Sequence, residues 1–156
     1  MPRFAVASVA ACAIALAVSL PAWAITTTYR APSSLTPDAL WAKVGAFCDI
    51  QKWLPPVDKC TLSADGRTRT LDLKGGGAVV EQLVSRNERA RSYTYRITSS
   101  PLPVDHYQST IRVVPEKGGS MLVWTGTYKA KGASDADAQK VIFGVYQAGA
   151  QQLVAP

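Results

Sequence analysis

The stretch 57–129 restricts the possible folds most, because polar and apolar residues alternate along it without a helical period. Short alternating runs separated by turns are typical of an antiparallel meander, in which we expect 68–74 to be the third strand of the chain. With a further strand over 25–31, we predict an α+β protein whose antiparallel sheet has about six to seven strands. The turn signals are Ala64-Asp65-Gly66, Gly75-Gly76-Gly77, Arg86-Asn87-Glu88, Pro101-Leu102-Pro103 and Glu116-Lys117-Gly118-Gly119.

The same alternation separates two faces of the sheet. One face collects aromatic and aliphatic residues and the other is largely polar, which is typical of an antiparallel sheet with one buried face. The residues expected on the inner face are Tyr93, Tyr95, Ile97, Tyr107, Ser109, Ile111, Val113, Leu122, Trp124, Gly126 and Tyr128. Periodicity does not assign Glu81 to either face, because its strand neighbours on both faces are similarly apolar.

A short helical hairpin is expected after the first strand. Thr36 can cap a helix that begins at Pro37, and an apolar stripe at helical spacing follows. A further helical turn over 50–53 ends before Pro55-Pro56. The stripe, which we expect in the core, consists of Leu40, Trp41, Val44 and Phe47.

The chain ends in a long helix that Ser134 can cap, with Asp137 three residues later, and that runs to about Val154. Its apolar side consists of Ala138, Ile142, Val145, Tyr146, Gly149 and Leu153. A glycine within a helix costs about 1 kcal/mol relative to alanine. Gly149 therefore predicts a close approach to the helix, either by the sheet backbone or by a ligand in a cavity.

The first 24 residues have the pattern of a cleavable secretory signal. Arg3 is the only charge before the apolar or small stretch 4–20, and Ala22-Trp23-Ala24 follows as an A-x-A site. Cleavage after Ala24 would leave 25–156 as one domain, in the periplasm or secreted, without a stable membrane anchor. One alternative is a transmembrane anchor, although the apolar stretch is shorter than the ~20 residues needed. Another is a lipoprotein processed at Cys12.

Charge and metal-ligand content exclude some partners. The net charge is +6, but basic residues such as Arg67 and Arg69 are scattered without interleaved aromatics, which argues against nucleic-acid binding. His106 is the only histidine and no CxxC motif is present, so we expect no metal and no cofactor. Cys48 and Cys60 can form a disulfide in an oxidising compartment, or remain two buried thiols.

The order of these elements resembles the helix-grip fold of the START-related superfamily. The superfamily includes the polyketide cyclase/dehydrase-like proteins of the SRPBCC family, the birch-pollen-allergen group and the plant abscisic acid receptors. The divergent bacterial polyketide-cyclase-like branch looks most similar. The resemblance covers nearly all of 25–156 and rests on LWAKVGAF (40–47) with Trp53 and Pro55, Glu81-Gln82-Leu83, Tyr93-Thr94-Tyr95, SPLP (100–103) with Tyr107, and SMLVWTGTY (120–128).

The resemblance implies a curved sheet that grips the long helix, with a cavity between them. It places Glu81, Tyr95 and Tyr107 at cavity positions, and it matches Gly75-Gly76-Gly77 and Pro101-Leu102-Pro103 to the mobile entrance loops of the hormone receptors. The lysine that anchors a carboxylate in those receptors falls at Asp58, so recognition of an acid by that route is not implied. With the aromatic inner face, the candidate ligand-binding residues are Trp53, Glu81, Tyr95, Tyr107, Trp124, Tyr128, Ile142, Val145, Tyr146 and Gly149.

We therefore expect an exported protein that holds an apolar or aromatic small molecule, or a lipid, between the sheet and the C-terminal helix. Two alternatives stay open. One is a cyclase or dehydratase that uses Glu81, Tyr95, Tyr107 or His106 as acid and base. The other is an accessory role, in which the domain docks on a periplasmic enzyme as its protein partner.

Overall fold

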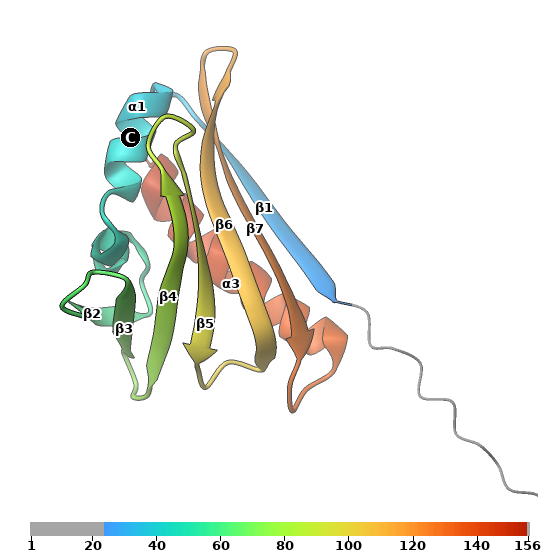
Figure 1. Cartoon of the computed structure of the whole chain (residues 1–156). Helices are drawn as coiled ribbons and strands as arrows, with labels where there is room; N and C mark the ends of the chain where they lie inside the picture. The colour runs from blue at the N-terminus through green and yellow to red at the C-terminus, as the bar shows by residue number, and fades with distance from the viewer. Residues whose placement is uncertain (1–23, 156) are drawn as a thin grey trace, which may run out of the picture.

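A computed structural model describes residues 24–155 (Figure 1). The expected signal sequence, apart from Ala24, lies outside the described residues. The strands are β1 (Ile25–Ser33), β2 (Val57–Leu62), β3 (Thr68–Leu73), β4 (Ala78–Asn87), β5 (Ser92–Ser99), β6 (Val104–Glu116) and β7 (Gly119–Ala130). The helical segments are α1 (Pro37–Val44), the 3-10 turn η1 (Phe47–Asp49), α2 (Ile50–Trp53) and α3 (Asp135–Val154).

The seven strands of the described part form one antiparallel sheet with the order β1-β7-β6-β5-β4-β3-β2. Strands β2 to β7 are the meander predicted from the alternation, since each pairs with the next one along the chain. β1 completes the sheet by pairing with β7, from Ile25 opposite Tyr128 to Ser33 opposite Ser120. The sheet curves around α3, which crosses its concave side (Figure 1). This is the helix-grip fold that the sequence predicts.

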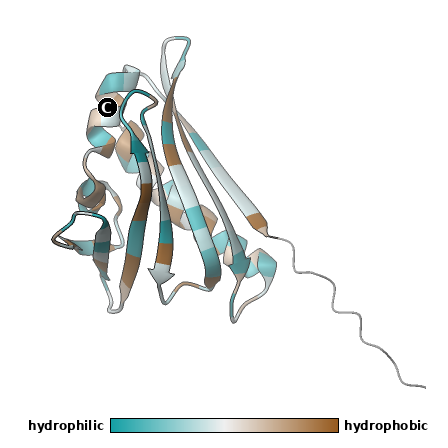
Figure 2. Ribbon diagram, in the orientation of Figure 1, coloured by the Kyte–Doolittle hydropathy of each residue, from teal (hydrophilic) through white to brown (hydrophobic). Residues whose placement is uncertain are grey.

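Hydrophilic and hydrophobic residues alternate along the strands, as Figure 2 shows. The expected inner face is buried, and the aromatic residues on it expose no more than 4% of their surface. These residues are Tyr93, Tyr95, Tyr107, Trp124 and Tyr128. The concave side of the sheet is therefore lined mainly by large rings that carry polar tips, and these tips need hydrogen-bond partners when they are buried.

The predicted capping residues begin both of the longer helices. Thr36 Oγ1 accepts a hydrogen bond from the Ala39 amide at 3.3 Å, and Ser134 Oγ accepts one from the Asp137 amide at 3.1 Å. α3 turns its apolar side to the sheet, so that Ile142 is buried at the middle of the domain. None of the helices in residues 24–155 is both long enough and apolar enough to cross a bilayer.

A disulfide joins Cys48 in η1 to Cys60 in β2, with 5.6 Å between the Cα atoms. The sequence left this pairing open. The Cys60 amide also donates to Gln51 Oε1 at 2.8 Å. Because β2 is an edge strand that pairs only with β3, these two links attach it to the helical hairpin.

Loss of the disulfide should lower the stability without changing the fold. The two cysteines are 12 residues apart, and closing a loop of that length contributes about 3 kcal/mol in the chain-entropy description. We expect a Cys48→Ala/Cys60→Ala variant to melt on the order of 10 °C below the oxidised protein in circular dichroism. The wild type in reductant is the control and should match the variant. Equal melting temperatures for the variant and the oxidised protein would contradict the expectation.

Candidate ligand-binding site

A largely enclosed cavity of about 80 Å³ lies between the inner face of the sheet, α2 and α3. Strands β3 to β7 form its floor, Leu54 after α2 contributes to one wall, and Val145 of α3 contributes to the opposite wall. Most of the lining side chains are aliphatic. The lining residues that carry polar side-chain atoms are Glu81, Tyr95, Tyr107 and Trp124.

Glu81 belongs to a buried ion pair at the edge of this cavity. Arg69 and Glu81 lie opposite each other on β3 and β4, and Arg69 Nε donates to Glu81 Oε2 at 2.6 Å. Their side chains are 0% and 6% exposed. Arg69 Nη1 also donates to the carbonyl oxygen of Phe47 in η1. The ion pair therefore connects two neighbouring strands to the helical hairpin.

Aromatic rings surround the Arg69 guanidinium. Its Cζ lies 4.0 Å from the ring centre of Phe47 and 5.1 Å from that of Tyr95, within the range of cation–π interactions. Burial lowers the pKa of Arg69, but the charge of Glu81, the two neighbouring tyrosines and the hydrogen bond to Glu81 together raise it by more, so the net shift is upward. Burial raises the pKa of Glu81, and the guanidinium opposes that rise. Since Arg69 remains charged, the pair stabilises the ionised form of Glu81.

A chain of buried hydroxyl groups begins at the cavity and runs behind it. Trp124 Nε1 donates to Tyr95 Oη at 3.1 Å and to Ser109 Oγ at 3.0 Å. Tyr107 Oη lies 3.4 Å from Tyr95 Oη and 2.6 Å from Tyr146 Oη. Tyr146 Oη in turn lies 3.0 Å from Ser109 Oγ. We refer to Tyr95, Tyr107, Tyr146 and Ser109 as the hydroxyl chain.

The tyrosines of the hydroxyl chain are neutral hydrogen-bonding groups. Burial disfavours the phenolate form and raises the pKa of Tyr95, Tyr107 and Tyr146. Gly126 provides the space for this arrangement, because a Cβ at that position on β7 would overlap the Tyr146 hydroxyl. Gly126, inside an otherwise regular strand, thus marks the place where the Tyr146 side chain of α3 meets the sheet.

Two loops lie together beside the cavity. Leu102 from the β5–β6 loop lines the cavity. A Cβ at Gly77, in the β3–β4 turn, would lie 3.7 Å from Pro101 Cγ, so the two loops are in contact. Gly75, Gly76 and Gly77 have φ angles of 94°, 100° and 84°, which side chains strongly disfavour. The structure thus places the two loops that the resemblance matched to entrance loops beside each other at the cavity.

The structure separates the candidate binding residues into two groups. Those that line the cavity are Glu81, Tyr95, Tyr107, Trp124, Ile142 and Val145. Those outside the lining are Trp53, Tyr128, Tyr146 and Gly149. Trp53 Nε1 donates to the Val44 carbonyl at 3.1 Å, and Tyr128 Oη hydrogen-bonds to Thr27 Oγ1 at 2.5 Å. The polar tips of these two residues are therefore satisfied within the protein.

The expectation of a cavity beside Gly149 is wrong. A Cβ at this position would lie 2.9 Å from Trp124 Cζ3 and 3.1 Å from both Leu54 Cδ1 and Trp53 Cζ3. Side chains approach the helix here, rather than the sheet backbone or a ligand. The physical reason is that bulky groups from the sheet and from the hairpin converge on this turn of α3. The cavity lies closer to the N-terminus of the helix, at Val145.

Arg69 is a site residue that the sequence pattern did not predict, because it belongs to the scattered basic residues. On β3 Arg69 shares one face with Leu71 and Leu73, and this alternation was the available signal that it points inward. A charged side chain on a buried face requires a partner. Alternation within one strand cannot reveal that partner, because the register that places Glu81 opposite Arg69 depends on the pairing of β3 with β4.

Two further positions lie outside the cavity lining. His106 is exposed at the irregularity between Asp105 and Gln108 in β6, with a φ of 51°. Asp58, the position of the receptor lysine, is exposed on β2. Within residues 24–155, no group of three histidine, cysteine or acidic side chains is arranged to hold a metal ion.

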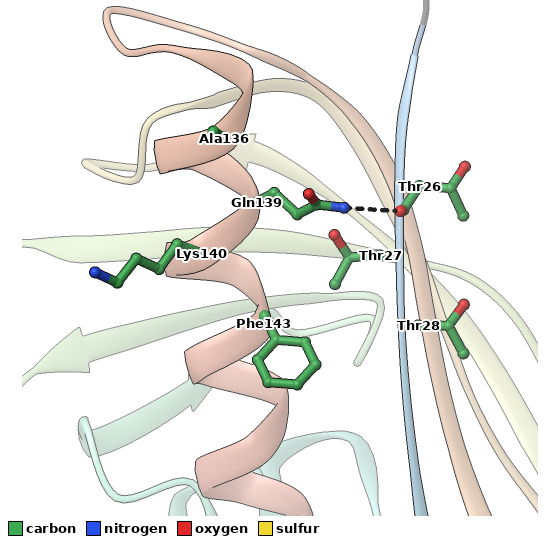
Figure 3. A pocket seen from close by; sticks show the side chains of 7 residues that line it. All are labelled: Thr26, Thr27, Thr28, Ala136, Gln139, Lys140 and Phe143. Atoms are coloured by element: carbon green, nitrogen blue, oxygen red, sulfur yellow. Dashed lines mark hydrogen bonds between the residues drawn. The ribbon is translucent and has the colours of Figure 1, made fainter.

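A larger hollow lies on the surface between β1 and α3 (Figure 3). Its volume is about 420 Å³, but it is an open groove. Gln139 Nε2 reaches the Thr26 carbonyl across it at 3.5 Å, while Lys140 points away from β1. Phe143 at its edge remains 42% exposed. An open groove removes little of a ligand's surface from water, so the interior cavity is the better candidate site.

The fold and the interior site define a helix-grip protein with an apolar cavity. Residues 24–155 match the family described as polyketide cyclase / dehydrase and lipid transport, and the chain belongs to this family. Comparison with curated proteins finds no match.

Similar solved structures come from several bacteria. XoxI from Bacillus cereus is 32% identical, with a TM-score of 0.77 over 84% of this chain and 92% of that chain. An uncharacterized protein from Bacillus thuringiensis is 31% identical, with a TM-score of 0.76 over 85% of this chain and 96% of that chain. A protein from Thermobifida fusca is 25% identical, with a TM-score of 0.70 over 83% and 90% of the two chains.

Gly149→Ala and Gly144→Ala should differ in their effects on stability. Gly144 lies on the exposed side of α3 with no atom within 4 Å of an added Cβ, so alanine should stabilise the helix by up to about 1 kcal/mol. At Gly149 the added methyl meets the Trp124 ring, and overpacking should cost about 1–3 kcal/mol against that gain. Urea unfolding of both variants measures the difference. Equal stabilities would mean that free space exists beside Gly149.

Arg69→Met should destabilise the protein strongly, because it leaves Glu81 buried without a counter-ion. Breaking a buried ion pair typically costs about 3–5 kcal/mol. The double variant Arg69→Met/Glu81→Leu buries no charge at this site and should regain most of the loss. Urea unfolding tests both variants. A double variant no more stable than Arg69→Met would contradict this account of the ion pair.

The stability that Arg69→Met loses should be smaller at low pH than at neutral pH. Burial raises the pKa of Glu81 above the unfolded value of about 4.3, and Arg69 opposes the rise. Below the unfolded pKa the carboxyl is protonated in both states and adds no cost, whereas the cost grows as the pH rises through the folded pKa. The variant should therefore be closer to the wild type at about pH 4 than at about pH 7. The same stability difference at both pH values would speak against an uncompensated Glu81.

Proposed function

We propose that the mature protein is an exported binding protein that holds a small apolar molecule in the interior cavity. The observation that carries this proposal is the cavity itself, whose walls are mostly aliphatic and whose polar groups gather on one side. Pockets of this kind, apolar with a few convergent polar groups, are the usual form of small-molecule sites. Membership of a family whose description includes lipid transport agrees with this function.

The size of the cavity limits how a ligand would enter. About 80 Å³ is room for two or three water molecules, whereas ligand pockets usually measure about 300–1,000 Å³. In this proposal the described conformation is the closed one, and the loops that carry Gly77 and Pro101 separate to admit the ligand. The three consecutive glycines of the β3–β4 turn favour such a movement, because glycine backbones rotate with little steric hindrance.

The chemistry of the site favours binding over catalysis. The raised pKa values of Tyr95 and Tyr107 keep both hydroxyls protonated, so neither is a ready base. Glu81 is held in place by its hydrogen bond from Arg69, which opposes the rise in the pKa of the carboxyl that burial causes. The polar groups are therefore suited to orienting a ligand.

The disulfide supports export. Disulfides form and persist outside the reducing cytoplasm, and Cys48–Cys60 is present in the fold. Export also agrees with the signal pattern of residues 1–24, whose A-x-A motif immediately precedes β1.

A cavity-filling substitution tests the proposed site. Val145 lines the cavity from α3, and Val145→Phe should fill the space and abolish binding of indole, followed by changes in amide NMR signals. Val141→Phe is the matched control, because Val141 lies one turn away on the same helix and is 38% exposed. It should bind indole as the wild type does.

Two outcomes would overturn the proposal. One is a wild type that binds no indole at millimolar concentrations, and the other is equal binding by Val145→Phe and the wild type. Thermal melts of both variants verify that they are folded. Mass spectrometry of small molecules that remain bound to the purified wild type would then identify the natural ligand.

A further inference from the structure

The hydrogen-bond donors of the residues that line the cavity are used within the protein. Two buried donor atoms among the described residues have no partner, Arg69 Nη2 and Tyr93 Oη, and neither residue lines the cavity. The Trp124 indole N–H is shared between Tyr95 Oη and Ser109 Oγ. Ser109 Oγ lies 2.9 Å from the carbonyl oxygen of Thr125. A carbonyl can only accept, so this bond uses the single hydroxyl proton of Ser109.

The direction of the remaining hydroxyl bonds follows from this proton count. Ser109 has no proton left, so Tyr146 donates to it. Tyr146 must then accept from Tyr107, which is 2.6 Å away, and the Tyr107 proton is used as well. The Tyr95 hydroxyl is directed toward Tyr107 at 3.4 Å. Each hydroxyl of the chain thus donates to the next, from Tyr95 through Tyr107 and Tyr146 to Ser109, so that none of these protons is available to a ligand.

Acceptor atoms, by contrast, remain free at the cavity. Glu81 accepts a hydrogen bond from Arg69, and the accepting atom is Oε2. Oε1 has no partner among the described residues, although Glu81 is 95% buried and lines the cavity. An ionised carboxylate oxygen in an apolar space gains strongly from a hydrogen-bond donor.

We infer that the ligand of this cavity is a neutral apolar molecule that carries an N–H or O–H donor and directs it to Glu81 Oε1. The inference rests on the proposed function and specifies the chemistry of its ligand. It excludes molecules whose polar group can only accept, since they would leave Oε1 without a partner and would place a second acceptor beside it.

Charge selects the neutral form of such a ligand. Arg69 already balances Glu81, so an ammonium group would bring an additional charge into an apolar space. A carboxylate would meet the acceptor oxygens of Glu81 and the tyrosines, and none of the lining residues has a free donor to receive it. An alcohol, a phenol or an indole-type N–H satisfies Oε1 without either cost.

Three molecules of nearly the same shape test this inference on the wild type. Indole offers an N–H donor, benzofuran has an oxygen acceptor at the same position, and indene has neither. Dissociation constants come from titrations followed by amide NMR signals. We expect indole to bind at least about tenfold more tightly than benzofuran, because a hydrogen bond to a buried charged group is among the stronger ones.

The outcomes separate the inference from the proposed function. If none of the three molecules binds, the proposed function fails and the inference fails with it. If benzofuran or indene binds as tightly as indole, the cavity accepts apolar ligands, but the role inferred for Glu81 Oε1 is wrong.

Tyr146→Phe tests the proton count directly. It removes the acceptor of the Tyr107 proton, so that the Tyr107 hydroxyl can turn its donor into the cavity. Benzofuran should then gain affinity and the preference for indole should fall severalfold. Tyr146 itself lies outside the cavity lining, so the substitution leaves the walls of the site in place.

Tyr128→Phe is the matched control. It also removes a buried tyrosine hydroxyl outside the lining, but that hydroxyl is bonded to Thr27 and not to the hydroxyl chain. The ratio of indole to benzofuran affinity should keep its wild-type value in this variant. If Tyr146→Phe keeps that ratio too, the inferred direction of the hydroxyl chain is overturned.

Discussion

The ion pair between Arg69 and Glu81 is the interaction on which the cavity depends. It joins β3 to β4 and, through the Phe47 carbonyl, joins both strands to the helical hairpin. An isolated carboxylate would be very costly in such an apolar space. The guanidinium, held between aromatic rings, makes an ionised carboxylate possible at this position. A carboxylate can therefore be buried among the residues that line the cavity.

The rest of the inner face is filled by rings, and this determines where the cavity can be. Trp124 stacks on Tyr146 with 4.5 Å between ring centres and meets Trp53 edge-on at 5.8 Å. These contacts bring side chains against Gly149 and leave no space there. Toward β3 and β4 the inner residues are smaller, as at Leu71 and Val79, and the space between sheet and helix remains open. The size of the side chains along the sheet thus decides which part of the interface encloses a cavity.

The hydroxyl chain and the ion pair give the cavity a directional polarity. The hydroxyls of the chain donate to one another and finally to the Thr125 carbonyl, whereas Glu81 Oε1, on a residue that lines the cavity, has no partner among residues 24–155. In the proposed function, such a surface would discriminate between ligands of the same shape by the type of polar group, because an unpaired buried group costs more than a formed hydrogen bond contributes. The apolar walls would then provide affinity for the proposed ligand, and the few polar atoms would provide selectivity.

The sequence by itself determined the local elements, because their signals lie within a few residues of one another. Alternation predicted the meander and its aromatic face, and Thr36 and Ser134 predicted where helices begin. It also predicted the cavity residues Tyr95, Tyr107 and Trp124, since each lies on the inner face of a strand.

Only the tertiary structure decided which of these residues meet. The partner of Arg69 depended on the register of β3 against β4, and the neighbours of Gly149 depended on where α3 crosses the sheet. The bridge between Cys48 and Cys60 likewise depended on the distance between η1 and β2. These contacts join residues on different elements. Local periodicity does not predict them, because the packing of whole elements against one another sets the distances between such residues.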